Sequence, residues 1–330
     1  MRMEHKPVTA GAAGDGAVIA DFPRPAKGSS TQHLLITLLT DFWLDSAEWI
    51  PSRLIVALAA DLEVTPSAAT SALSRLASRG VLEQSSVGRS SRYRLTDNAR
   101  ARLVTAVDRV FAFGTGTAHW DGSWTVIAFT IQETSRDVRE LFRRHLKWRG
   151  FAPVYGALWV SPREDPKELE RACGTFGVTD YVIFRTADSA LHGKKLIEAW
   201  PLDELTRPYE PFIDRFAPWM SRTATGDITP EEAFRVRVQL MDTWRMFPWS
   251  DADLPLELLP ERRQLTMARN LFADLCMGLA DRALEHVQTH AARHAPDLSP
   301  SACLRLPGSD RDGTSTDPTP SPGPAADGRM

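Results

Sequence analysis

The sequence predicts an α+β protein made of several domains. Three observations predict this class. The chain has 330 residues, which corresponds to two or three domains at about 100–200 residues each. Its apolar residues recur at helical spacing in some segments and alternate in others, so both helices and strands are expected. Segments rich in Gly, Pro and Ser separate these regions and predict linkers and loose ends.

The composition excludes several classes of protein. Hydrophobic residues make up 43% and charged residues 25%, and the net charge is −3, so the whole chain is not a polybasic coat for nucleic acid. No apolar run approaches the ~20 residues that cross a bilayer, and no secretory signal is expected. Cys173, Cys276 and Cys303 are far apart. This spacing excludes a disulfide scaffold or a CxxC zinc site, and we expect a cytoplasmic protein with no membrane partner.

Both ends of the chain are predicted to be disordered. Residues 1–30 are rich in Gly, Ala, Pro and Ser with little apolar periodicity, and residues 295–330 have the same character. The ordered part is therefore expected from about Thr31 to His294.

The first domain is expected over residues 31–113 and begins with three helices. Apolar residues between Leu34 and Phe42 have helical spacing, and a second helix follows from Pro51. Thr65 is suited to cap a third helix, which runs to residue 79 and ends before Gly80.

A hairpin and a fourth helix complete this domain. Residues 81–84 and 91–95 alternate and predict two strands, joined by a loop over 85–90. Thr96 then caps a helix with an apolar stripe. The order helix, helix, helix, hairpin, helix predicts a winged helix-turn-helix.

The remaining chain predicts two more domains. Residues 120–193 show the order βαββαβ, which is typical of a ferredoxin-like sandwich. Residues 194–294 are mostly helical, and their longest helices are expected over 230–246 and 261–294. We expect this last domain to take part in dimerisation and in effector binding.

The strongest functional signal is a basic stretch from Val64 to Arg109. It holds eight arginines and three carboxylates, a net charge of +5 in an acidic protein. Such charge suits DNA, because neutralised phosphates release condensed counterions. The candidate DNA-binding residues are Ser67, Thr70, Ser71, Ser74, Arg75 and Arg79 of the third helix and Arg89, Ser90, Arg92 and Arg94 of the hairpin. The alternatives are a solvated charge run and a winged helix that contacts protein.

These segments resemble a known family. Residues 69–76, 80–82 and 88–96 resemble the N-terminal domain of the phenylacetate-degradation repressor (PaaX-like) family. Residues 124–129, 141–149 and 150–162 resemble its middle domain, and 200–202 and 254–260 its C-terminal region. The resemblance implies a homodimeric bacterial repressor that binds double-stranded operator DNA and is released by an aryl-acyl-CoA such as phenylacetyl-CoA.

The alternative function is an enzyme, either a metal-dependent nuclease or an acyl-CoA-handling protein with an accessory winged helix. The middle domain resembles small CRISPR-associated nucleases, which need an aspartate at the end of the first strand. Here that strand ends in Phe129-Thr130-Ile131-Gln132, and metal-assisted hydrolysis needs convergent oxygen ligands. We therefore expect no catalytic residues, no cofactor and no enzyme activity.

The sequence does not settle the role of two further sets of residues. Arg143 and Arg144, with Trp200 and Trp244, are candidate effector-binding residues, because they combine charge for phosphates with aromatic rings. His286, His290 and His294 recur every four residues and could offer two imidazoles to zinc or nickel. A solvated helix face is the alternative for this stripe, and we assign no metal site from the sequence.

Overall fold

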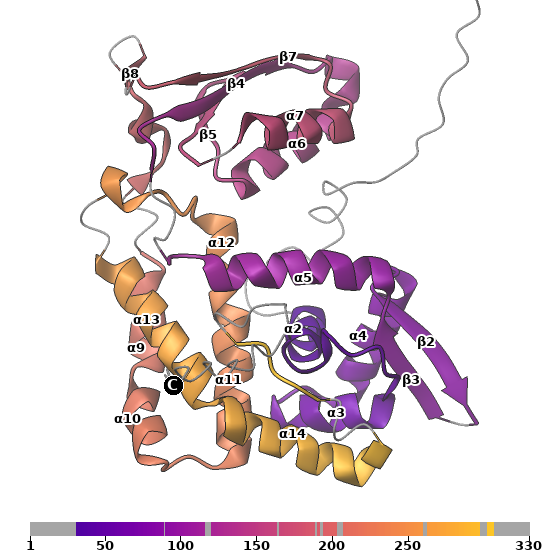
Figure 1. Ribbon diagram of the computed structural model, residues 1–330. Helices are drawn as coiled ribbons and strands as arrows, with labels where there is room; N and C mark the ends of the chain where they lie inside the picture. The colour runs from indigo at the N-terminus through magenta and orange to yellow at the C-terminus, as the bar shows by residue number, and fades with distance from the viewer. Residues whose placement is uncertain are drawn as a thin grey trace, which may run out of the picture.

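The structure is a computed structural model that describes residues 31–88, 90–115, 120–163, 165–188, 190–191, 194–202, 207–259, 263–297 and 302–306. The predicted disordered segment 1–30 and most of the predicted tail lie outside these residues. Figure 1 shows a four-stranded sheet with two helices at one end of the molecule, and a larger, mainly helical body at the other.

The N-terminal region has the predicted order of elements. Its helices are α2 (Thr31–Trp43), α3 (Ser52–Asp61), α4 (Pro66–Ser78) and α5 (Asp97–Ala112), and its strands are β1 (Ile50–Pro51), β2 (Leu82–Val87) and β3 (Ser90–Leu95). The strands form an antiparallel sheet in the order β1-β3-β2. Strand β1 was not predicted, because two residues show no period. Strand β2 also continues through residues 85–87, which were predicted as loop.

Local capping explains where α4 and α5 begin and end. The Thr65 hydroxyl accepts a hydrogen bond from the Ala68 amide at 3.3 Å, and the Thr96 hydroxyl accepts one from the Ala99 amide at 3.1 Å. Gly80 follows α4 with φ of +71°, a conformation that favours glycine. These three predicted signals are confirmed.

The middle region contains the sheet at the top of Figure 1. Its elements are β4 (Trp124–Thr130), a short turn η1 (Glu133–Ser135), α6 (Arg136–Trp148), β5 (Ala152–Tyr155), β6 (Leu158–Ser161), α7 (Pro166–Phe176) and β7 (Asp180–Thr186), followed by β8 (Ala190–Leu191) and β9 (Lys194–Lys195). The four long strands are antiparallel in the order β5-β6-β4-β7. Phe129 and Phe142 belong to the core between this sheet and its helices, and Trp124 and Trp200 to a second cluster.

The C-terminal region is helical, as predicted. Its elements are η2 (Leu196–Ala199), α9 (Tyr209–Phe216), α10 (Pro218–Thr225), α11 (Pro230–Trp244), α12 (Phe247–Ser250), η3 (Leu256–Leu258), α13 (Arg263–Gly278) and α14 (Ala280–His294). Among the described residues, every helix is too short or too polar to span a bilayer.

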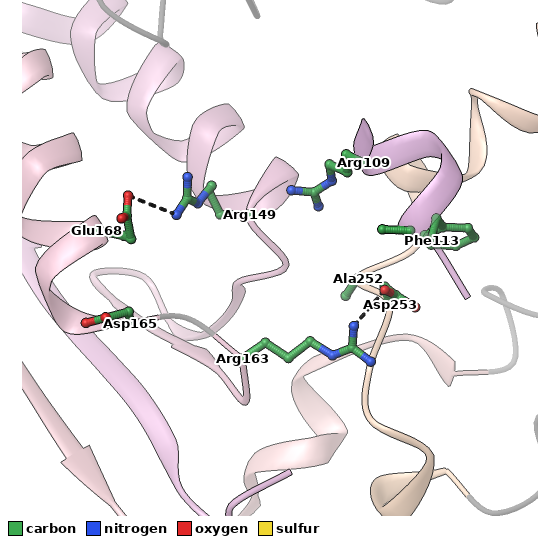
Figure 2. A pocket seen from close by; sticks show the side chains of 9 residues that line it. Arg109, Phe113, Arg149, Arg163, Asp165, Glu168, Ala252 and Asp253 are labelled. Atoms are coloured by element: carbon green, nitrogen blue, oxygen red, sulfur yellow. Dashed lines mark hydrogen bonds and ion pairs between the residues drawn. The ribbon is translucent and has the colours of Figure 1, made fainter. Parts of the chain in front are cut away.

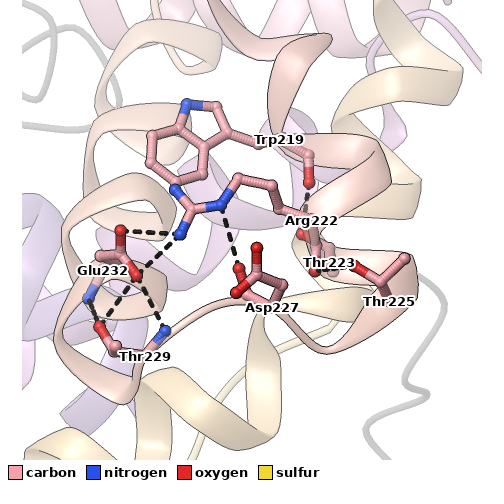
Figure 3. A network of polar contacts seen from close by, with 7 residues as sticks. All are labelled: Trp219, Arg222, Thr223, Thr225, Asp227, Thr229 and Glu232. Atoms are coloured by element: carbon pink, nitrogen blue, oxygen red, sulfur yellow. Dashed lines mark hydrogen bonds and ion pairs between the residues drawn. The ribbon is translucent and has the colours of Figure 1, made fainter.

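The prediction of one continuous helix over 261–294 is wrong. The helix is interrupted next to Gly278, where α13 ends and α14 begins two residues later. A Cβ at Gly278 would lie 2.5 Å from the Thr223 methyl group, so α10 packs where a side chain would stand. Contacts of the neighbouring Arg222 hold Thr223 in place (Figure 3). The Arg222 guanidinium lies over the Trp219 ring, 4.9 Å from its centre, and pairs with Glu232 at 2.9 Å.

The N-terminal and C-terminal regions share one hydrophobic core. Helix α11 packs on α2, and α14 packs on α3. At the centre, the Arg237 guanidinium binds both oxygens of Asp41 at 2.8 Å, with both side chains at most 1% exposed. Burial is the largest single influence on the pKa of Arg237 and would lower it, but the contacts with Asp41 and Cys276 together outweigh burial. The pKa is therefore raised, and the guanidinium stays charged.

Part of the predicted tail is packed on this core. Ala302 is buried, the Cys303 amide donates to the Phe42 carbonyl at 3.1 Å, and Arg305 pairs with Asp45 at 2.9 Å. The prediction of disorder from 295 onward therefore does not hold for residues 302–306, because these contacts depend on residues more than 190 positions away, which composition does not reveal.

Candidate nucleic-acid interface

The outer face of α4 is exposed and rich in hydroxyl groups. Its apolar inner face, with Leu73 and Leu76, is buried against the rest of the N-terminal region. The outer residues line a shallow hollow; they are Pro66, Ser67, Thr70, Ser71, Ser74 and Arg75. The structure therefore brings five of the predicted DNA-binding residues to one face of one helix. Four of the five have small side chains, and Arg75 is the one long side chain among them.

Arg75 is positioned by its own helix. Its guanidinium donates to the Ser71 hydroxyl one turn earlier, at 2.7 Å. Thr70 turns its hydroxyl inward and donates to the Pro66 carbonyl at 2.8 Å. A guanidinium carries five N–H donors, so the contact with Ser71 orients Arg75 and leaves donors for a ligand. Arg79 lies at the end of α4, where it contacts Gln32 at 3.5 Å.

The hairpin arginines are held by an unpredicted aromatic residue. Arg92 and Arg94 lie on the same side of β3, and both guanidinium groups pack on the Trp49 ring, at 5.0 Å and 4.5 Å from its centre. Arg94 also pairs with Glu83 at 2.7 Å. Ser90 is exposed at the tip, and Arg89 lies outside the described residues. Among the described carboxylates, none pairs with Arg92, so Arg92 differs from Arg94 in having no neutralising partner there.

Two other arginines of the basic stretch have structural contacts. Arg100 donates to the carbonyls of Leu44 and Ser46, at 3.3 and 2.5 Å. Arg109 donates to the Trp148 carbonyl and packs on the Trp148 ring at 4.3 Å. Both guanidinium groups are thus directed toward other parts of the protein, so not all eight arginines of the stretch are directed toward a ligand.

The four candidate effector-binding residues do not lie together in the structure. Arg143 and Arg144 lie on α6, where both contact Glu140. Trp200 stacks on Trp124 in the middle region, and Trp244 is wholly buried, stacked on Phe272 and hydrogen-bonded to the Val110 carbonyl at 3.1 Å. These four residues thus occupy separate places and do not form one pocket.

A cavity of about 370 Å³ lies instead where the three regions meet. It is lined by Arg109, Ala112 and Phe113 of the N-terminal region, by Arg149, Arg163, Asp165 and Glu168 of the middle region, and by Ala252 and Asp253. Figure 2 shows Arg163 turned toward Asp253, which it binds at 2.6 Å, and Arg149 turned toward Glu168 at 3.8 Å. Sequence reasoning missed this pocket, because its residues come from segments far apart in the chain.

Family comparisons cover all three regions. Residues 30–99 match the model of a PaaX-like protein, residues 117–197 the PaaX protein central Cas2-like domain, and residues 200–289 the PaaX-like protein C-terminal domain. The transcriptional repressor PaaX of Escherichia coli (strain K12) is 30% identical over 227 residues, which are 66% of this chain and 70% of that protein. The chain belongs to the PaaX family. This relative is a transcriptional repressor, in agreement with the expectation of no enzyme activity.

A solved structure shares the fold of this PaaX-family chain. It is the uncharacterized protein Rv0674 from Mycobacterium tuberculosis, with a TM-score of 0.53 and 20% sequence identity. The likeness covers 78% of this chain and 99% of that one. At this identity it supports the arrangement of elements and says nothing of ligands.

Proposed function

We propose that this PaaX-family protein is a homodimeric repressor that binds operator DNA through α4 and the β2–β3 hairpin. The observation that carries the proposal is the exposed hydroxyl face of α4 with Arg75 held above it. We assign the N-terminal region as a winged helix-turn-helix, since its helices and antiparallel hairpin follow that order. Repression is taken from the relative in Escherichia coli.

In this proposal α4 enters the major groove. The serines and Thr70 allow close approach, and the planar guanidinium of Arg75 reaches a base edge, where guanine offers two acceptors. The hairpin lies on the neighbouring backbone and Arg92, already fixed on Trp49, meets a phosphate. Helix α4 thus supplies sequence specificity and the wing supplies affinity.

The middle region supplies the dimer contact in this proposal. We assign it a ferredoxin-like fold from its strand order β5-β6-β4-β7. Paired residues Tyr155, Leu158, Ala128 and Val182 form an apolar row across all four strands. Tyr155 and Val182 are 50% and 61% exposed, and Phe184 beside them is 47% exposed. Such a row suits burial against a second copy of the same surface.

The pocket between the three regions is the proposed effector site. Its arginines suit phosphate or carboxylate groups, and Phe113 offers an aromatic wall. An aryl-acyl-CoA, the effector that the family resemblance implies, carries phosphate groups and an aromatic ring. A ligand here would separate Arg109 from the Trp148 carbonyl and change the angle between DNA-binding and middle regions. We further propose that the regulated genes serve phenylacetate-type aromatic catabolism.

The test measures DNA binding by the full chain and its Arg75→Ala variant with a fragment of its own promoter. The variant should lose about 1–3 kcal/mol of binding free energy on this fragment and much less on random DNA. The matched control is Arg171→Ala, which changes an exposed arginine of α7. This variant should bind both DNAs with the affinity of the unaltered chain. An equal loss on both DNAs would assign Arg75 to the backbone, and degradation of DNA with added Mg²⁺ would favour a nuclease.

Release is tested in the same assay. Phenylacetyl-CoA should dissociate the complex, whereas free CoA should not. Calorimetry should then show binding that Arg163→Ala weakens. Ligand binding without DNA release would contradict the release mechanism and leave the DNA-binding proposal intact.

A further inference from the structure

Three side chains with metal-binding donors meet between α3 and α14. His286 and His290 lie one turn apart on α14, and Asp61 is the last residue of α3. The Nε2 atoms of His286 and His290 lie 2.8 and 3.2 Å from the same carboxylate oxygen of Asp61. All three donor atoms lie within 4.8 Å of one another. The third histidine of the stripe, His294, is not part of this group.

We propose that Asp61, His286 and His290 bind a divalent transition-metal ion of the Zn²⁺ type. Two imidazole nitrogens and one carboxylate oxygen are a ligand set that Zn²⁺ uses with a water molecule in the fourth position. At metal–ligand distances of about 2.0–2.2 Å, tetrahedral ligand atoms lie roughly 3.3–3.5 Å apart. The observed separations of 2.8 and 3.2 Å are slightly shorter. Small outward shifts of Asp61 would therefore admit the ion.

The surroundings hold the ligands in place. The His286 ring packs on Phe234 of α11 at 5.0 Å and on His290 at 4.7 Å between ring centres. The side chains of Asp61, His286 and His290 are 22%, 11% and 16% exposed. This degree of burial limits competition from bulk water, yet the site retains a path for an ion. Nitrogen donors favour Zn²⁺, Ni²⁺ or Cu²⁺ over Mg²⁺.

The ion would join the two regions that flank the core. Asp61 belongs to the N-terminal region, and both histidines belong to the C-terminal region. His286 lies 225 residues after Asp61 in the sequence. Helix α3 also packs on α4. A bound ion would therefore fix α14 on α3 and, through α3, stabilise the support of the proposed DNA-reading helix.

The experiment uses the full chain, freed of metal by a chelator and then dialysed. Zn²⁺ should bind one ion per chain in calorimetry, and Co²⁺ should give the visible absorption of a four-coordinate site. At free Zn²⁺ of 100 times the Kd, the melting temperature should rise by about 5–10 °C. Mg²⁺ at the same concentration should have no effect.

Variants separate this site from other surface histidines. His290→Gln and Asp61→Asn should each weaken Zn²⁺ binding by more than about 100-fold, since even outer-sphere changes cost 10–100-fold. His294→Gln, on the next turn of α14, is the matched control and should keep wild-type affinity. Failure of the unaltered chain to bind Zn²⁺ or Co²⁺ would overturn the proposal. Equal affinity in folded Asp61→Asn would also overturn it, and would assign the three side chains to a hydrogen-bonded cluster.

Discussion

Removing one partner of the buried pair between Asp41 and Arg237 should strongly destabilise the shared core. Asp41→Asn removes the negative charge while keeping the side-chain shape, and it leaves the guanidinium charged at 0% exposure. Breaking a buried ion pair from one side costs about 3–5 kcal/mol. For a region of roughly 150–250 residues, 1 kcal/mol lowers the melting temperature by about 2–4 °C. The expected loss is therefore about 6–20 °C.

A second pair on the same helix provides the control. Arg235, two residues before Arg237, pairs with Glu63 at 2.8 Å, but these side chains are 38% and 81% exposed. Both pairs join α11 to the N-terminal region, so they differ chiefly in burial. Glu63→Gln should cost at most about 1 kcal/mol, since exposed pairs are screened by water.

Thermal denaturation followed by circular dichroism measures both variants. The double variant Asp41→Leu with Arg237→Met should recover most of the loss, because no buried charge remains. Recovery should be incomplete, since Arg237 also donates to the carbonyls of Cys276 and Arg305. Melting of Asp41→Asn within about 2 °C of the unaltered chain would refute this reasoning. It would show that the two carbonyls alone satisfy the guanidinium.

Two further predictions concern the proposed DNA and dimer contacts. Arg92→Ala should reduce the slope of log K against log salt concentration by about 0.9, the value for one lost phosphate contact. Arg94→Ala should change the slope less, because Glu83 already neutralises Arg94; equal changes in fluorescence-anisotropy titrations would contradict this. Val182→Glu places a charge in the apolar row beside Phe184 and should yield monomers in sedimentation velocity. An unchanged mass would remove this surface as the dimer contact.

Local signals in the sequence predicted most elements. Thr65 caps the start of α4 and Thr96 caps the start of α5, and both caps were expected. Such signals act within a few residues, so they can be recognised without the fold. The break next to Gly278 was missed, and so was the close approach of Thr223 to Gly278, because that contact comes from a helix outside the local sequence.

The candidate site shows the same limit. The face of α4 follows from helical periodicity alone. The pairing of Glu83 with Arg94 depends on the hairpin register, which the predicted loop over 85–90 did not give. The packing of Arg92 and Arg94 on Trp49 could not be predicted from the sequence. Trp49 precedes a strand of only two residues, which is too short to show a pattern. Contacts between distant segments need the tertiary structure.

The shared core also has a consequence for synthesis of the chain. Asp41 and Arg237 are 196 residues apart. At about 5–20 residues per second, the ribosome needs roughly 10–40 s to make the partner of Asp41. During this interval the side of α2 that packs on α11 is not yet covered, and Phe42 lacks its contact with Phe234. The N-terminal region is thus made well before the helix that completes its core. Chaperones that shield apolar helices have their opportunity in this interval.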